Sequence, residues 1–207
     1  MALAVPQFTA EDGENYSMLD HILTYLEFVK GTVMVVHSRP NVLENDPWLS
    51  KYRRWEELGV RPLAPDVHSA IEGLGELNEA TYGTGRTESQ VSELQAMTYH
   101  AACRRAIFYL KECFEKCAEP DTRGYCLAWP LQAGPDYITA IKDRQSLALL
   151  IMMYWGVLLE QISYDIWWAQ RIGKCLIDDL ANEMSNSNTE TFDEGIKWAR
   201  EQVGLEA

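Results

Sequence analysis

The sequence predicts an all-α fold, a single helical domain of about seven to nine helices that covers residues 1–207. Apolar residues recur at steps of three and four positions in most segments, which places them on one face of a helix. No segment alternates apolar and polar residues for long enough to indicate a strand. No internal repeat or long low-complexity linker divides the chain, so we expect one domain.

The predicted helices follow one another with short connectors. Asp46 before Pro47, Asp66, and the capping-box pair Thr87 and Gln90 are the clearest start signals. Prolines and glycines break the helical pattern between residues 120 and 135. The expected helices cover residues 15–36, 46–58, 67–77, 91–117, 136–142, 146–159, 165–180 and 192–203.

One predicted helix is apolar all round. Residues 147–159, "LALLIMMYWGVLL", contain no charged side chain on any face. A helix that covers one side of a core needs only an apolar stripe, so this helix needs neighbours on every side. It is shorter than the roughly 20 apolar residues that cross a bilayer, and we therefore expect a buried helix and no membrane span.

The charge balance excludes some classes of partner. The chain has 31 acidic and 18 basic residues, and its formal net charge is −13. Affinity for the phosphates of nucleic acids comes from Lys and Arg that displace counterions, and anionic membrane surfaces attract the same residues. We therefore expect no direct contact of this chain with nucleic acid or with an anionic membrane.

The cysteines indicate a reducing compartment. There are five, an odd number at irregular spacing, and the first residues, "MALAVPQFTAEDGE", have neither a basic region nor a long apolar region of a secretion signal. We therefore expect reduced thiols in an intracellular protein of the nucleus or cytoplasm. The cysteines are Cys103, Cys113, Cys117, Cys126 and Cys175.

Two groups of side chains resemble metal ligands in type. His100, Cys103, Cys113 and Cys117 belong to a single predicted helix, and about 1.5 Å per residue separates the ends of this group by about 25 Å. Zinc requires all ligands within about 2.3 Å of one point, so this group is not expected to bind it. We expect no metal here.

The second group is the acidic run "DDLANE", with Asp178, Asp179 and Glu183. Its spacing is similar to an aspartate-rich magnesium motif of prenyl-handling enzymes, in which oxygens at i and i+4 hold a hydrated ion. Such enzymes also need a second metal motif and basic residues for a diphosphate, which are hard to find in so acidic a chain. A solvated helix end is the expected role, and no cofactor is predicted.

Catalysis has little support in the sequence. The glycines do not lie between a strand and a helix as in a phosphate-binding loop, and no G-x-S-x-G motif is present. An enzyme would need a polar group that faces its substrate. The available candidates are Tyr154, His37, Asp165 and Asp143, and none has a partner that the sequence identifies.

Aromatic residues and methionines are concentrated in the second half of the chain. Methionine adapts its shape and tryptophan offers a large apolar surface with one polar donor, so both suit the wall of an apolar pocket as well as an ordinary core. Composition leaves these two interpretations open. The residues are Trp129, Met152, Met153, Tyr154, Trp155, Trp167 and Trp168.

Three segments resemble the C-terminal regulatory domain of fungal zinc-cluster (Zn2Cys6) transcription factors, particularly the sterol-uptake regulator type. They are "LTYLEFVKGTVMVV" with Gly31, "QSLALLIMMYWGVLLEQISYDIWWAQRIGKCLIDDL" with Gly173, and "IKWAREQVGL" near the end of the chain. The similarity runs along nearly the whole sequence. Arg171 and Ile172 stand where the family often has a smaller or aromatic pair, Ala199 stands for its usual proline, and its six-cysteine DNA-binding motif is absent.

This resemblance implies an all-α regulatory domain, often dimeric, with an internal apolar cavity that binds a sterol or another lipophilic molecule and so controls transcription. No DNA-binding domain is expected in this chain. The early helix, the central loop and the apolar helix would supply the wall. From side-chain type and position we expect these wall residues: Phe28, Val33, Met34, Trp129, Leu131, Met152, Met153, Trp155 and Leu158.

Two other functions use the same features. A stand-alone enzyme of natural-product biosynthesis could bind a lipophilic substrate in the same cavity and convert it by shape and desolvation. In an interaction scaffold, the apolar surplus would instead form a homodimer interface. A bound lipophilic compound favours the sensor, whereas a chemically altered compound favours the enzyme.

Overall fold

The computed structural model describes residues 17–37, 59–83, 93–118, 120–163, 170–185 and 190–206. These residues form eight α-helices and two 3-10 helices and contain no strand, which confirms the predicted all-α class. The predicted helix over 46–58, the capping box at 87–90 and the start of the helix predicted from residue 165 lie outside the described residues. The α-helices are α1 (Met18–His37), α4 (Pro65–Tyr82), α5 (Glu93–Lys116), α6 (Trp129–Ala133), α7 (Pro135–Lys142), α8 (Ser146–Ile162), α9 (Ile172–Ser185) and α10 (Asp193–Gln202).

The long helix α5 does end before residue 120, but the stretch between residues 120 and 135, which was expected to be a central loop, is helical. A 3-10 helix, η1 (Pro120–Ala128), and the short helix α6 fill this stretch, and α7 begins directly after it. A second 3-10 helix, η3 (Glu190–Phe192), precedes α10. Pro130 and Pro135 occupy the first turns of α6 and α7, where the missing N–H of proline costs no helical hydrogen bond. The prolines therefore start helices in this region.

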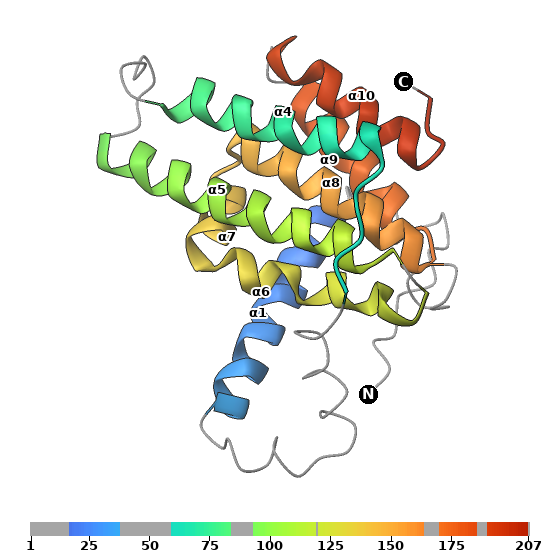
Figure 1. Ribbon diagram of the computed structural model, residues 1–207. Coiled ribbons are helices and arrows are strands. Elements are labelled where there is room, and N and C mark those ends of the chain that lie inside the picture. The colour runs from blue at the N-terminus through green and yellow to red at the C-terminus, as the bar shows by residue number, and fades with distance from the viewer. Residues whose placement is uncertain are drawn as a thin grey trace, which may run out of the picture.

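Helix α8 is the centre of the fold. Fourteen of its seventeen residues are buried, and it packs against α4, α5, η1, α7, α9 and α10. In Figure 1, α4 and α5 lie side by side on one side of it. Because neighbours cover α8 on all sides, its sequence needs no polar face. This enclosure accounts for the thirteen uncharged residues from 147 to 159.

The neighbours of α8 follow from the helical period of 100° per residue. Gly156 and Glu160 face α9, because Gly156 meets Gly173 and Ile177 there. Tyr154 faces α10, where Gly195 lies against it. Trp155 lies about 100° from both Gly156 and Tyr154 around the helix and faces η1 and α6. The apolar helix is therefore divided into sides with different partners.

Two glycines allow α8 and α9 to pack closely. A Cβ atom built on Gly173 would lie 2.3 Å from the Gly156 carbonyl oxygen and 2.5 Å from the Glu160 backbone nitrogen. Both distances are too short for any side chain. Only a hydrogen atom fits at this position on the Cα of Gly173. Gly173, which belongs to one of the segments that resemble the zinc-cluster regulators, is thus required for packing.

Helix α1 attaches to the other helices by its first half. Met18, Leu19, Ile22 and Leu26 are buried, and the helix packs against α9 and α6. Its second half projects away from the other helices in Figure 1. The attachment of α1 therefore depends on few apolar residues and on the polar contacts around them.

Candidate functional site

The predicted wall residues are partly brought together by the fold. Trp129, Met152, Met153, Trp155 and Leu158 are all buried and belong to one core cluster. Leu131, two residues after Trp129 on α6, is 37% exposed. The side chains of Phe28, Val33, Met34 and His37, and the whole of Asp165, lie outside the described part of the chain.

Three aromatic rings form the middle of this cluster. Trp129 of α6 stacks on Trp155 of α8, with ring centroids 5.5 Å apart and planes 28° apart. Tyr137 of α7 meets Trp129 edge-on at 5.3 Å and 72°. Aromatic pairs prefer such offset or edge-to-face geometries, so these contacts add to the stabilisation from area burial. We call Trp129, Tyr137 and Trp155 the aromatic centre.

Every polar atom of the aromatic centre donates to a backbone carbonyl. The indole Nε1 of Trp129 donates to Ala106 at 2.9 Å, and that of Trp155 donates to Cys126 at 2.8 Å. The Tyr137 hydroxyl donates to Ala148 at 2.9 Å, and burial raises the pKa of Tyr137. The polar groups are therefore satisfied within the protein, and the rings present only apolar surface to any molecule beside them.

The two central methionines lie on different sides of α8. At 100° per residue, Met152 shares a side with Trp155, whereas Met153 lies about 160° from Trp155. Met153 instead lies on the side of Gly156 and Glu160, which faces α9. A compact ligand at the aromatic centre could thus touch Met152, while Met153 belongs to the packing between α8 and α9. Sequence reasoning placed both in one wall because it could not show which neighbouring helix each side of α8 faces.

The catalytic candidates do not gather into an acid–base pair. Tyr154 packs its ring against Trp198 of α10 at 4.4 Å, and its hydroxyl has no hydrogen bond in the described part of the chain. Burial and then the charge of Glu194 raise the pKa of Tyr154, so its hydroxyl stays protonated at neutral pH. Asp143 precedes the first turn of α8 and accepts a short hydrogen bond from Tyr99. Burial followed by this bond raises the pKa of Tyr99.

The histidine and cysteines of α5 have separate environments. His100 lies 3.0 Å from Glu79 through its Nε2 atom, whereas Cys103 and Cys113 are fully buried. Cys126 of η1 approaches Cys117, a proximity that sequence spacing did not indicate because η1 folds back along α5. Among the residues that the structure describes, no three His, Cys, Asp or Glu side chains are arranged to hold a metal ion.

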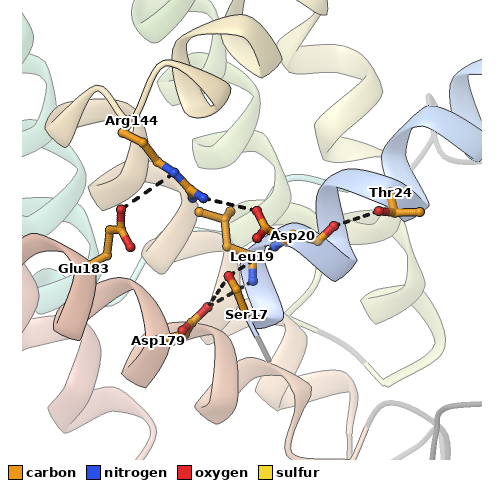
Figure 2. A network of polar contacts seen from close by, with 7 residues as sticks. All are labelled: Ser17, Leu19, Asp20, Thr24, Arg144, Asp179 and Glu183. Carbon is orange, nitrogen blue, oxygen red and sulfur yellow. Dashed lines mark hydrogen bonds and ion pairs between the residues drawn. The ribbon is translucent and has the colours of Figure 1, made fainter. Parts of the chain in front are cut away.

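The acidic run on α9 joins helices that are distant in the sequence (Figure 2). Ser17 caps α1 by accepting the Asp20 N–H at 3.3 Å. The Asp179 carboxylate accepts from the Ser17 hydroxyl and from the Leu19 N–H, both at 3.1 Å. Asp179 thus satisfies a free backbone donor in the first turn of α1 and places a negative charge at its positive end. The sequence predicted a solvated helix end and missed this interhelical role.

A second set of contacts in Figure 2 centres on Arg144, in the turn between α7 and α8. Its guanidinium lies 3.1 Å from Asp20 of α1 and 3.7 Å from Glu183 of α9. Nearby, Lys142 pairs with Glu27 of α1 at 2.6 Å. These groups are all at least a third exposed, so they orient α1 more than they stabilise it.

Replacing Asp179 with alanine is expected to lower the free energy of unfolding by about 1 kcal/mol, as for loss of other helix caps. Amides in the first turn of α1 should then exchange faster with solvent, because one carboxylate no longer holds them. Hydrogen exchange followed by mass spectrometry measures this. Asp178→Ala is the control, since that side chain only forms a half-exposed pair with Arg200 at 3.0 Å. Equal effects of both substitutions would contradict the capping role.

Thiol reactivity should separate Cys175 from the other cysteines. Cys175 is partly exposed, whereas Cys103, Cys113, Cys117 and Cys126 are buried. A thiol reagent such as DTNB is expected to modify one cysteine rapidly in the native protein and all five after denaturation. Rapid reaction of two or more thiols in the native state would show that the core around α5 opens readily.

The same burial predicts a loss of stability at alkaline pH. Burial raises the pKa of Cys103 to about 12, so the native state keeps a proton that the unfolded chain releases from about pH 9. The free energy of unfolding should therefore fall as pH rises above about 9. Denaturant midpoints measured across this range test the direction. The slope should be shallower in Cys103→Ala, and an unchanged slope would exclude Cys103 as a cause.

Comparisons with protein-family models, curated proteins and solved structures find no match to this chain. Of the described helices, none alone has the length and apolar composition needed to cross a membrane. Helices α7 and α8 reach these limits only when taken together, and they are bent by 110° relative to each other.

Proposed function

We propose that this chain is a regulatory domain that binds a lipophilic small molecule of sterol-like type, and that its occupancy controls transcription. The main support for the proposal is the aromatic centre together with Met152. Its rings offer a flat apolar surface whose polar atoms are already satisfied, and the methionine beside Trp155 can change shape around a guest. The resemblance to fungal zinc-cluster regulators supports the same function.

The position of α6 supports a path from solvent to this centre. This helix has only five residues, and its exposed Leu131 lies one half-turn from the fully buried Trp129. Arg105 of α5 donates from Nε to the Gln132 carbonyl at 2.7 Å, and Gly134 ends the helix at a φ of 92°. Displacing this short cover would expose Trp129 without unfolding α8.

Ligand extraction and thermal shift test the proposal together. Purified protein is denatured, extracted with organic solvent and analysed by mass spectrometry, and the intact protein is then melted with and without added ergosterol or cholesterol. We expect either a stoichiometric lipophilic compound in the extract or a rise in Tm with a sterol. An empty extract together with an unchanged Tm for a panel of sterols and fungal lipids would overturn the proposal.

Matched methionine substitutions locate the binding site. Met152→Leu keeps side-chain volume but removes flexibility, so it should weaken sterol binding by about tenfold while changing stability little. Met97→Leu is the control, because Met97 is 63% exposed on the outer face of α5. Equal binding by both variants and the unsubstituted protein would place the ligand away from the aromatic centre.

The enzymatic alternative predicts a different result in the same experiment. A supplied compound would return chemically altered, and Tyr154→Phe would abolish the change while leaving the fold intact. A homodimer is part of the regulatory proposal and rests on the resemblance, and a location in the nucleus or cytoplasm rests on the cysteines and on the resemblance. Size-exclusion chromatography with light scattering measures the first.

A further inference from the structure

The outer face of α5 is unusually apolar for an exposed surface. Leu94 is 75% exposed, Met97 63% and Phe108 62%, although the opposite face of the same helix packs into the core. Single exposed apolar residues are common, but a row of large ones on one helix face is typical of an interaction site. Nothing in the described part of the chain covers these three side chains.

These residues form a stripe, which Arg104 and Arg105 flank between Ala101 and Phe108. Leu94, Met97, Ala101 and Phe108 are spaced by three, four and seven positions, so they share one side of α5 over about 21 Å. The surface is hollowed around the small Ala101, between Phe108, Tyr109 and two arginines. A hollow over a small residue between two large ones can receive an apolar side chain from a partner helix.

Between Leu94 and Lys111 the charged residues are all basic, whereas Glu93 precedes the stripe and Glu112, one turn after Phe108, pairs with Lys116 at 2.8 Å. Arg104 and Lys111 are exposed, and neither side chain forms an ion pair or hydrogen bond within the described residues. Other cations of this acidic chain do find carboxylates, for example Lys142 with Glu27 at 2.6 Å and Arg200 with Asp178 at 3.0 Å. Arg104 and Lys111 are therefore available to the carboxylates of another molecule.

From this combination we infer that the outer face of α5 is a docking site for an acidic amphipathic helix of a partner protein. Apolar side chains of that helix would lie along Leu94, Met97 and Phe108, with one of them over Ala101. Its Asp or Glu residues would pair with Arg104 and Lys111. Charge complementarity of this kind determines which partner binds and accelerates association.

Two other occupants fit the charges less well. Pairing of α5 with the α5 of a second copy would place two copies of Arg104 and Arg105 in one small interface, where like charges repel. Arg105 is also already held by the Gln132 carbonyl and lies 5.7 Å from the Tyr109 ring centroid. An anionic membrane would attract Arg104 and Lys111 but repel a molecule with a net charge of −13.

The inference is independent of the lipophilic ligand proposed above, because none of the residues of the stripe belongs to the aromatic centre. Failure of the sterol experiments would therefore leave it unaffected. Equally, a protein that binds a sterol need not use this face.

Two designed peptides provide the test. The first is a helical peptide with leucines at i, i+4, i+7 and i+11 and glutamates beside them, and the second carries lysine in place of every glutamate. Binding to the full chain is measured by fluorescence anisotropy at two salt concentrations. We expect the acidic peptide to bind at least ten times more tightly than the basic one, with an affinity that falls as salt increases.

Surface variants assign the binding to α5. Arg104→Glu and Phe108→Ser should each weaken binding of the acidic peptide by tenfold or more without changing Tm, because both side chains are exposed. Lys197→Glu makes the same charge change on α10, where Lys197 is 62% exposed, and should leave binding unchanged.

The inference would be overturned if the two peptides bound equally well, or if binding of the acidic peptide were unchanged in both α5 variants. Self-association abolished by Phe108→Ser, in the absence of peptide binding, would instead assign the face to a second copy. Binding to vesicles of phosphatidylcholine and phosphatidylserine that Arg104→Glu abolishes, again without peptide binding, would assign it to a membrane.

Discussion

Replacing Gly173 with alanine is expected to destabilise the protein by about 3 kcal/mol or more, since overpacking against rigid backbone cannot be relieved by a change of rotamer. The added Cβ would lie 2.3 Å from the Gly156 carbonyl oxygen, so α8 and α9 would have to move apart. That movement would disturb the most buried helix of the fold. Denaturant titration followed by circular dichroism gives the change in the free energy of unfolding.

Two other glycines make this a graded series. A Cβ on Gly156 would meet Cγ1 of Ile177, a side-chain atom, at 2.9 Å, so Gly156→Ala should cost less than the clash with backbone atoms at Gly173. Gly75 on α4 has no atom within 4 Å of the same position. Gly75→Ala should therefore stabilise the protein by about 0.5–1 kcal/mol, as expected inside a helix. If all three substitutions had the same effect, close contact between α8 and α9 would not be the cause.

Replacing Trp129 with alanine is expected to cost about 3–5 kcal/mol, the usual range for removing a large buried aromatic side chain. The substitution removes the stacking on Trp155, the contact with Tyr137 and the hydrogen bond to the Ala106 carbonyl. Near-ultraviolet circular dichroism should lose the signal of the stacked tryptophans, and denaturant titration measures the stability.

Variants at and near Trp129 show which of these lost interactions causes the loss of stability. Trp129→Phe keeps an aromatic ring but removes the indole donor, so its loss should be smaller than that of the alanine variant. Leu131→Ala, two residues further along α6, changes a side chain that is 37% exposed and should have little effect. A similar loss from Leu131→Ala would mean that α6 as a whole, rather than the aromatic centre, determines stability.

The positions of the helices could be predicted from the sequence better than the contacts between them. The period of apolar residues located α5, α7 and α10 to within two positions and α4 to within five, and the uncharged run identified α8 as buried. The sequence could not show which elements bury α8. The same apolar side chains suit a helix that packs against protein and a helix that lines a ligand cavity, and only the packing of distant helices distinguishes the two.

The features that were missed depend on contacts between residues distant in the sequence. Asp179 was expected to face solvent, because nothing near it reveals that the start of α1 lies beside it, 160 positions earlier in the chain. The prolines between residues 120 and 135 were read as breaks, although proline is equally suited to the first turn of a helix. In both cases the local pattern allowed two structures, and tertiary packing selected one.

The enclosure of α8 has a consequence for how the protein is made. On the ribosome, α8 is complete before α9 and α10 have been synthesised, so its sides that face them remain uncovered until those helices follow. During that interval Leu150 and Tyr154 lack the α10 surface that later lies against them. Exposed apolar helices of this kind promote aggregation and recruit chaperones. Fragments that stop before Asp193 should therefore accumulate as insoluble protein, although they contain most of the core.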